Sequence, residues 1–208
     1  MIRRHQRLLN RPMATAMTIT GALLPPESSG RLGRRPVMRK ARSMPSGEGL
    51  HPSAAAVAVV LHELDPGAEV RQLDSSTRSA AEAAAALGCE VGAIASSLVF
   101  IAVDGPVLIM TSGAHRVDLD LVAAEAGLTG LRKATAGEVR AATGQAIGGV
   151  APVGHPAPLR TFVDRHLARY PKLWAAAGTP HAVFATNFEQ LMAITAATAL
   201  QVSSDRPA

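Results

Sequence analysis

A tight turn between two apolar segments occupies the middle of this 208-residue chain. The dipeptide Asp104-Gly105 favours a two-residue β-hairpin, and it lies between the apolar segments 98–103 and 107–112. The sequence therefore predicts two antiparallel strands over these segments. We expect this hairpin to form the centre of a sheet.

Helical periodicity and capping signals predict helices on both sides of the hairpin. Apolar residues recur at helical spacing up to Leu64, where Asp65-Pro66-Gly67 stops the helix. Ser76 or Thr77 is expected to cap an alanine-rich helix that ends at Gly88. Further helices are expected over 118–126, 135–142 and 187–196, with caps at Asp118, Thr135 and Asn187.

Short apolar or alternating segments predict strands at 69–73, 131–134, 161–164 and 181–185. The alternation of helices and strands predicts an α/β fold. Between Gln145 and Pro158 the chain contains two adjacent glycines and three prolines, which exclude regular structure. A loop of this length is more often functional than not.

Charge divides the chain near residue 50. Residues 1–50 hold ten basic and two acidic residues, a balance of +8, whereas the remainder holds eleven basic and fourteen acidic residues, a balance of −3. We therefore expect a basic arm over 1–48, a folded domain over 49–203 and a tail over 204–208. An arm rich in Pro, Gly, Ser and Arg buries little apolar surface, so we expect disorder there, or a translation start further downstream. Its arginines could also contact phosphates.

Composition argues against several classes of protein. The single cysteine, Cys89, excludes an intramolecular disulfide, and the seven histidines show no spacing suited to a metal, so neither a metal nor another cofactor is expected. Nucleotide-binding glycine loops and the serine hydrolase elbow are absent. No apolar run approaches the roughly 18 to 20 residues that span a bilayer. We expect a cytoplasmic protein with neither membrane nor DNA as a partner.

Three segments in order carry a resemblance to a known family. They are residues 77–100, with AEAA, LG and IASSLVF; residues 143–152, TGQAIGGVAP; and residues 177–181, AGTPH, followed by FEQL at 188–191. Together they resemble the YbaK/EbsC family, which includes the editing domain of bacterial prolyl-tRNA synthetases. The order and spacing of the segments make the resemblance specific.

The resemblance implies both a fold and a function. The fold is a single domain with a mixed, largely antiparallel or barrel-like sheet flanked by helices. The function is hydrolysis, in trans, of the ester that links a mischarged small amino acid to the terminal ribose of a tRNA. The implied partner is the 3′ end of an aminoacyl-tRNA, with a synthetase or an elongation factor as a further partner. An aminoacyl ester is already activated, so a positioned water or ribose hydroxyl and a stabilised oxyanion suffice without a cofactor.

The resemblance also places the site in the glycine-rich loop. Gly148 and Gly149 are expected to surround the aminoacyl group as catalytic backbone groups, because glycine allows close approach. Val150 and Pro152 are expected to shape a pocket that excludes larger amino acids. A plain structural turn is the alternative interpretation of this loop.

In the central strand this chain departs from the family pattern. Many members carry a lysine where this chain has Ser96, the third candidate catalytic residue, followed by Ser97 as a candidate substrate-binding residue. In a regular strand only one of the two serines faces the pocket. Serine cannot replace a cation that faces phosphate or a developing oxyanion. Two hypotheses stay open: an enzyme with a different catalytic arrangement, or a module that binds a tRNA end or a synthetase without turnover. A third is hydrolysis of another small aminoacyl ester.

Other side chains complete the predicted site. Thr179 and His181 are expected to bind substrate, His181 by hydrogen bonding or by orienting water, with a structural histidine as the alternative. Trp174 is expected in the core or in a subunit contact. The pair Arg132-Lys133 is interpreted as phosphate contacts or as solvated surface charges.

Overall fold

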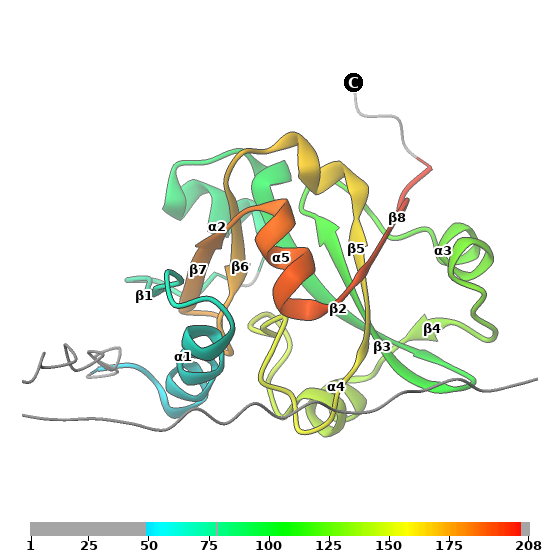
Figure 1. Ribbon diagram of the computed structural model, residues 1–208, viewed down its shortest axis with the longest axis horizontal. Coiled ribbons are helices and arrows are strands. Elements are labelled where there is room, and N and C mark those ends of the chain that lie inside the picture. Colours follow the sequence, from blue (N-terminus) through cyan, green and yellow to red (C-terminus); the bar gives the residue numbers. More distant parts are fainter. Residues whose placement is uncertain (1–48, 78, 205–208) are drawn as a thin grey trace, which may run out of the picture. The chain divides into compact units, whose positions relative to one another are not determined.

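The computed structural model describes residues 49–77 and 79–204, so the predicted arm over 1–48 and residues 205–208 of the predicted tail lie outside the described residues. In chain order, the described elements are α1 (Pro52–Leu64), β1 (Val70–Gln72), α2 (Ala80–Leu87), the 3-10 helix η1 (Val91–Ala93), β2 (Ile94–Ala102), β3 (Gly105–Ser112), α3 (Leu119–Ala126), β4 (Arg132–Lys133), α4 (Ala136–Thr143), β5 (Arg160–Asp164), the 3-10 helix η2 (Arg165–Arg169), β6 (Leu173–Ala176), β7 (Ala182–Thr186), α5 (Phe188–Thr195) and β8 (Thr198–Leu200). Figure 1 shows their arrangement.

The predicted hairpin is confirmed and lies at the centre of the sheet. β2 and β3 pair antiparallel until Ala102 lies opposite Gly105, so the two-residue turn is Val103-Asp104, one residue earlier than predicted, and β3 begins at Gly105. Gly105 has a φ of 125°, in the region that favours glycine. β2 begins at Ile94, earlier than the predicted strand, because η1 leads directly into it.

The sheet has the strand order β1-β7-β6-β2-β3-β5-β8, and β4 also pairs with β2. The pairs β1–β7, β6–β7, β2–β3 and β2–β4 are antiparallel, and β2–β6, β3–β5 and β5–β8 are parallel. The expected mixed, largely antiparallel sheet flanked by helices is therefore confirmed.

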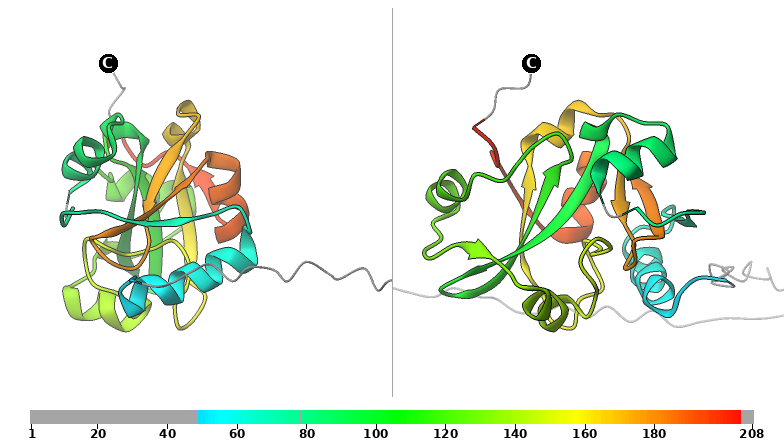
Figure 2. Two further views of the ribbon diagram at one scale, coloured as in Figure 1. Left: turned by 90° about the vertical axis from the view of Figure 1, so that its left-hand side faces the viewer. Right: turned by 180° about the vertical axis from the view of Figure 1, so that it is seen from behind.

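Helices cover both faces of this sheet. Leu108 and Met110 of β3 belong to a core cluster with residues of α1, α4 and α5, whereas their neighbours Val107 and Ile109 pack with α3. This alternation follows from the two-residue period of a strand. α1 and α5 lie in front of the sheet in Figure 1, and α2 comes to the front in the view from behind (Figure 2). The strands of the hairpin thus lie between two layers of helix, whereas the residues of its turn are exposed.

Three of the predicted helix starts are confirmed. Asp118, Thr135 and Asn187 cap α3, α4 and α5, and each side chain accepts a hydrogen bond from a backbone N–H in the first turn. Gly127 and Gly144 end α3 and α4 in the left-handed conformation. These boundaries depend on contacts within a few residues, which is why the sequence predicts them.

The predicted cap of α2 is wrong. Ser79, not Ser76 or Thr77, caps this helix and forms a capping box with Glu82. Thr77 is buried instead, and its backbone N–H and hydroxyl donate to the Pro180 carbonyl at 2.8 and 3.0 Å. Thr77 therefore makes a long-range contact with Pro180 and does not cap the helix.

Two strands have no counterpart in the sequence prediction. β6 contains Leu173 and Trp174 followed by alanines, and it pairs in parallel with the start of β2. β8 is a three-residue strand that pairs in parallel with β5. Neither shows the alternation of a half-buried strand, because β6 is buried on both faces and β8 is very short.

Candidate functional site

One edge of β2 is open over a few residues. On the side away from β3, β2 pairs with β6 at Ile94 and Ala95 and with β4 at Phe100 and Ile101. Between these two pairings, residues 96–99 have β3 on one side and a cavity on the other. The central strand of the sheet thus exposes a short length of its own backbone.

The cavity at this open edge has a volume of about 360 Å³ and a largely apolar wall. Small and aliphatic side chains come from α2, from the glycine-rich loop and from β6 and β7, and hydroxyl groups come from three segments, namely the start of α2, β2 and the turn before β7. The lining residues are Thr77, Ser79, Ala80, Ala83, Leu87, residues 94–100, Lys133, Ala134, Val139, Ile147, Gly148, Val150, residues 174–176, Thr179, Ala182 and Val183. This volume lies within the usual range of small-molecule sites.

Backbone hydrogen-bonding groups point into the cavity. The amide of Gly113 donates to the Ile94 carbonyl at 2.8 Å, which shows that the N–H and C=O groups of the even-numbered residues of β2 face β3. By the alternation of an antiparallel ladder, the N–H and C=O groups of Ser97 and Val99 face away from β3. The Val99 carbonyl accepts from the Ala134 amide at 3.3 Å. The N–H groups of Ser97 and Val99 and the Ser97 carbonyl are therefore directed into the gap.

Five of the predicted site residues line this cavity. They are Ser96, Ser97, Gly148, Val150 and Thr179. Both serines line it although β2 is a regular strand, because the cavity lies at the edge of the strand and not over one face. The Ser97 hydroxyl is buried and has no hydrogen-bond partner among the described residues.

Three other predicted site residues lie outside the cavity wall. Gly149 packs behind it, Pro152 is buried in the loop, and His181 is exposed beyond the turn. The His181 amide donates to the Thr179 hydroxyl at 3.3 Å, so its backbone helps to shape the turn while its side chain points elsewhere. The structure therefore brings the glycine loop and the central strand together but leaves the His181 imidazole apart from them.

The glycine-rich loop and the turn at Gly178-Thr179-Pro180 pack backbone against backbone. A methyl group on Gly149 would lie 2.3 Å from the carbonyl carbon of Thr179. Gly178 has a φ of 89°, and a methyl group there would lie 2.8 Å from the carbonyl oxygen of Ser53 in α1. The two segments thus form one unit that has no room for side chains at these glycines.

Gln145 holds the glycine-rich loop in its irregular shape. This buried side chain accepts a hydrogen bond from the Ala151 amide at 2.7 Å and donates one to the Val153 carbonyl at 3.5 Å. The neighbouring His155 Nε2 contacts the Ala151 carbonyl at 2.9 Å, and burial lowers the pKa of this imidazole. A side-chain amide here replaces the backbone pairing that a strand would supply.

Lys133 is the single charged residue of the cavity wall within the described chain. Its neighbour Arg132 makes two hydrogen bonds with the Glu138 carboxylate, at 2.6 and 3.0 Å. These bonds, with those from Thr135, hold the pKa of Glu138 at about 2. The paired charges Arg132 and Glu138 thus stand apart from the cavity, and Lys133 faces it.

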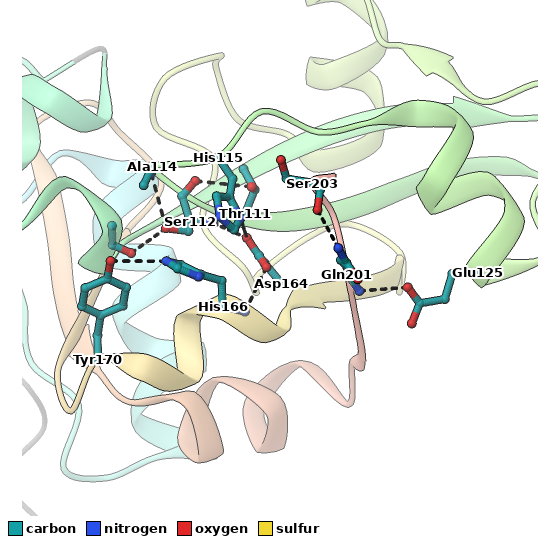
Figure 3. Close-up of polar contacts among 11 residues, drawn as sticks. Thr111, Ser112, Ala114, His115, Glu125, Asp164, His166, Tyr170, Gln201 and Ser203 are labelled. Atoms are coloured by element: carbon teal, nitrogen blue, oxygen red, sulfur yellow. Dashed lines mark hydrogen bonds and ion pairs between the residues drawn. The ribbon is translucent and has the colours of Figure 1, made fainter. Parts of the chain in front are cut away.

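A buried polar cluster braces the strands behind the site (Figure 3). The Asp164 carboxylate at the end of β5 accepts from the amides of Ser112 and His166 at 3.1 and 3.0 Å, and it contacts His115 Nδ1 at 2.8 Å. Asp164 caps η2 in this way. The Ser112 hydroxyl donates to the Gly92 carbonyl at 2.8 Å, which ties β3 to η1, the 3-10 helix that leads into β2. The cluster fixes the strand whose open edge forms the cavity.

Several kinds of chemistry find no ready arrangement in residues 49–77 and 79–204. No group of three or more His, Cys, Asp or Glu side chains there is placed to hold a metal ion. Burial raises the pKa of the Cys89 thiol, which lies outside the cavity wall. No helix in the same residues is long and apolar enough to cross a membrane. The cavity therefore offers backbone groups, hydroxyls and one ammonium.

Comparison with known proteins identifies the family of this domain. The family model for the aminoacyl-tRNA editing domain matches residues 74–194. The chain belongs to this family. Every cavity-lining residue lies within the matched range, so the editing domain contains the entire cavity. A search of curated proteins gave no match.

Solved structures agree with this assignment. The editing domain is 44% identical to a protein proposed to be a trans-editing enzyme for prolyl-tRNA synthetase, over 75% of this chain and 99% of that one, with a TM-score of 0.71. It is 40% identical to a structure from work on computational epitope grafting onto scaffold proteins, over 76% and 100% of the chains, also with a TM-score of 0.71. A hypothetical protein matches at 28% identity, over 71% and 98% of the chains, with a TM-score of 0.66. The expected resemblance to YbaK-type domains is confirmed.

Proposed function

We propose that this editing domain hydrolyses, in trans, the ester of a small amino acid mischarged on a tRNA. The observation that carries the proposal is the open edge of β2, where two backbone N–H groups and one carbonyl face a cavity of about 360 Å³. Fixed N–H donors are the groups that stabilise the oxyanion of an ester under attack. They need no rearrangement during the reaction, because the sheet already holds them.

The reaction draws on few protein groups. The oxygen of a water molecule, or the neighbouring ribose hydroxyl, attacks the ester carbonyl carbon, and the developing oxyanion accepts a hydrogen bond from one of the two free N–H groups, that of Ser97 or that of Val99. The bond to the ribose oxygen then breaks, and that oxygen takes a proton. With water as the final acceptor, the products are the free amino acid and an intact tRNA end. Positioning supplies most of the acceleration, since an aminoacyl ester is already activated.

The cavity favours a small amino acid. Ala83, Val150 and Val183 contribute apolar side chains to the wall of the cavity. The loop that carries Val150 is closely packed, with Ala151 fully buried. A larger side chain would have to displace this loop, which Gly149 and Gln145 hold against the rest of the fold. Close packing resists such expansion.

A non-catalytic recognition module is the second candidate. Ser96 stands in the cavity wall where many family members carry a lysine, and the wall offers no carboxylate or imidazole as a general base within the described residues. A module of this kind would bind a tRNA end or a synthetase and leave the ester intact.

Deacylation assays distinguish the two candidates. Purified tRNAs charged with alanine, serine, threonine, cysteine or 2-aminobutyrate are incubated with the wild type, with Leu98→Asp and with Val103→Asp. Leu98 is 40% exposed in the cavity wall, and Val103 is 75% exposed in the hairpin turn outside it, so both variants should fold. We expect selective hydrolysis by the wild type and by Val103→Asp, and little by Leu98→Asp. If the ester stays intact on every tRNA while tRNA or synthetase binding is retained, the proposed hydrolytic activity is wrong and the recognition module stands.

A further inference from the structure

The ammonium of Lys133 lacks a counter-ion beside an otherwise uncharged cavity. β4 is only two residues long, and side chains of neighbouring strand residues point to opposite sides. Arg132 reaches Glu138 on one side, which leaves Lys133 to the cavity side, where it lines the wall. No ion pair joins Lys133 to a carboxylate in the described part of the chain.

Glu138 is not available to Lys133. Its two carboxylate oxygens accept hydrogen bonds from the Arg132 guanidinium and from the backbone and hydroxyl of Thr135. The contacts from Thr135 form the capping box that starts α4, so the fold itself holds the Glu138 carboxylate in place for Arg132. The Arg132 guanidinium thus has an acidic partner within the domain, whereas the neighbouring Lys133 ammonium is free to bind an anionic ligand.

We propose that Lys133 binds the phosphodiester that precedes the terminal nucleoside of the substrate, which sets the direction in which the substrate enters. This inference rests on the proposed function, since it deepens the same site. Lys133 lies beside Phe100, at one end of the open edge, and β6 lies at the other. The gap over residues 96–99 is roughly 13 Å long, at about 3.3 Å per residue.

Charge decides which end of the substrate lies at Lys133. The amino group of an aminoacyl ester is largely protonated near neutral pH, so it avoids an ammonium and favours an acceptor. The Ser97 carbonyl, directed into the gap, is such an acceptor. A phosphodiester is anionic and gains a charge-assisted hydrogen bond from lysine. The phosphate end therefore lies toward β4, and the amino acid lies toward the glycine loop and β6.

Binding measurements test Lys133 without relying on hydrolysis. The probes are adenosine, which has no phosphate, and cytidylyl-adenosine, which has one phosphodiester. Their dissociation constants are measured by calorimetry for the wild type, Lys133→Met, Lys133→Arg and Arg140→Met. Arg140 is exposed on α4 and does not line the cavity, so its variant removes the same charge from a nearby surface.

We expect Lys133→Met to weaken the binding of cytidylyl-adenosine by about 10-fold to 100-fold, the usual effect of losing a hydrogen bond to a charged group. Adenosine binding should stay the same. Lys133→Arg should retain most of the affinity, and Arg140→Met should match the wild type. The salt dependence of log K for the dinucleotide should fall by about 0.7 in Lys133→Met, as expected for one phosphate contact on a single strand.

Other outcomes overturn the inference. Equal losses for both probes in Lys133→Met would assign the lysine a structural role, and equal losses in Arg140→Met would assign the effect to general charge. A wild type that binds the dinucleotide no more tightly than adenosine would exclude a phosphate contact. Failure of the proposed hydrolysis is a separate result, because it appears in the deacylation assay and leaves these dissociation constants unaffected.

Discussion

The backbone of Gly149 lies directly against the backbone of Thr179, so that a methyl group on Gly149 would come within 2.3 Å of the Thr179 carbonyl carbon and 2.5 Å of its Cα. Neither atom belongs to a flexible side chain that could move away. The contact joins the glycine-rich loop to the turn before β7, and both segments contribute to the cavity wall. Glycine is required here by close approach.

Gly149→Ala is expected to lower the free energy of unfolding by about 1 to 3 kcal/mol, because the new methyl group must push two backbone segments apart. Deacylation should fall with it, since Gly148 and Val150 would move. Urea unfolding gives the stability, and the tRNA panel gives the activity. The control is Gly137→Ala, where a methyl group meets nothing within 4 Å in the first turn of α4. That variant should be neutral or up to about 1 kcal/mol more stable. Equal behaviour of the two variants would contradict the close contact.

Gln145→Leu is expected to loosen the glycine-rich loop. It removes the acceptor of the Ala151 amide and the donor to the Val153 carbonyl, both inside the loop. Leaving such groups unpaired costs about 1 to 3 kcal/mol. Hydrogen exchange should show faster exchange of the Ala151 amide than in the wild type. Gln190→Leu, at an exposed position of α5, should leave that amide protected; faster exchange in both variants would argue against a specific role for Gln145.

Asp164→Asn is expected to destabilise the brace behind the site. The carboxylate accepts from two backbone amides and contacts His115 Nδ1, and an asparagine has only one acceptor oxygen (Figure 3). Hydrogen bonds to charged groups are worth about 1.5 to 3 kcal/mol each, so a loss of at least about 2 kcal/mol should appear in denaturant unfolding at pH 7. Asp120→Asn, exposed in the first turn of α3, should stay within about 0.5 kcal/mol of the wild type.

His155 makes stability depend on pH. Burial lowers the pKa of this imidazole below its ordinary value of 6.5, so below that value the unfolded chain binds more protons than the folded chain. Stability should therefore fall as the pH decreases from about 7 toward 5, by at most about 1.4 kcal/mol per pH unit for one proton. His155→Gln should reduce this slope in unfolding measurements at several pH values. Some slope should remain, because burial also lowers the pKa of His166. A variant with the wild-type slope would disprove the contribution.

Local signals in the sequence predict most of the secondary structure. The caps Asp118, Thr135 and Asn187 and the turn after Ala102 act over two to four residues, so they can be recognised without knowledge of the fold. The start of α2 also has a local signal, the Ser79–Glu82 capping box, which the prediction of Ser76 or Thr77 missed. Only the contact of Thr77 with Pro180, far away in the sequence, depends on the fold.

The candidate site is less accessible to the same reasoning. The sequence points to Gly148, Val150, the two serines and Thr179, all of which line the cavity. It does not predict that β6 would pair with only the first residues of β2, which creates the gap. Without knowledge of this gap, Lys133 cannot be assigned to the cavity, and Trp174 cannot be recognised as part of the cavity wall. Both follow from pairings between segments far apart in the chain.

The free stretch of β2 is too short to pair with a strand of another chain. A long free strand edge at the rim of a sheet invites another chain to add as a further strand, which is a common route to aggregation. Here the free stretch is four residues long and is enclosed by β6 on one side and β4 on the other. An incoming strand would find too few partners and no space to align. The domain can keep peptide groups free for a small molecule without offering a template to another chain.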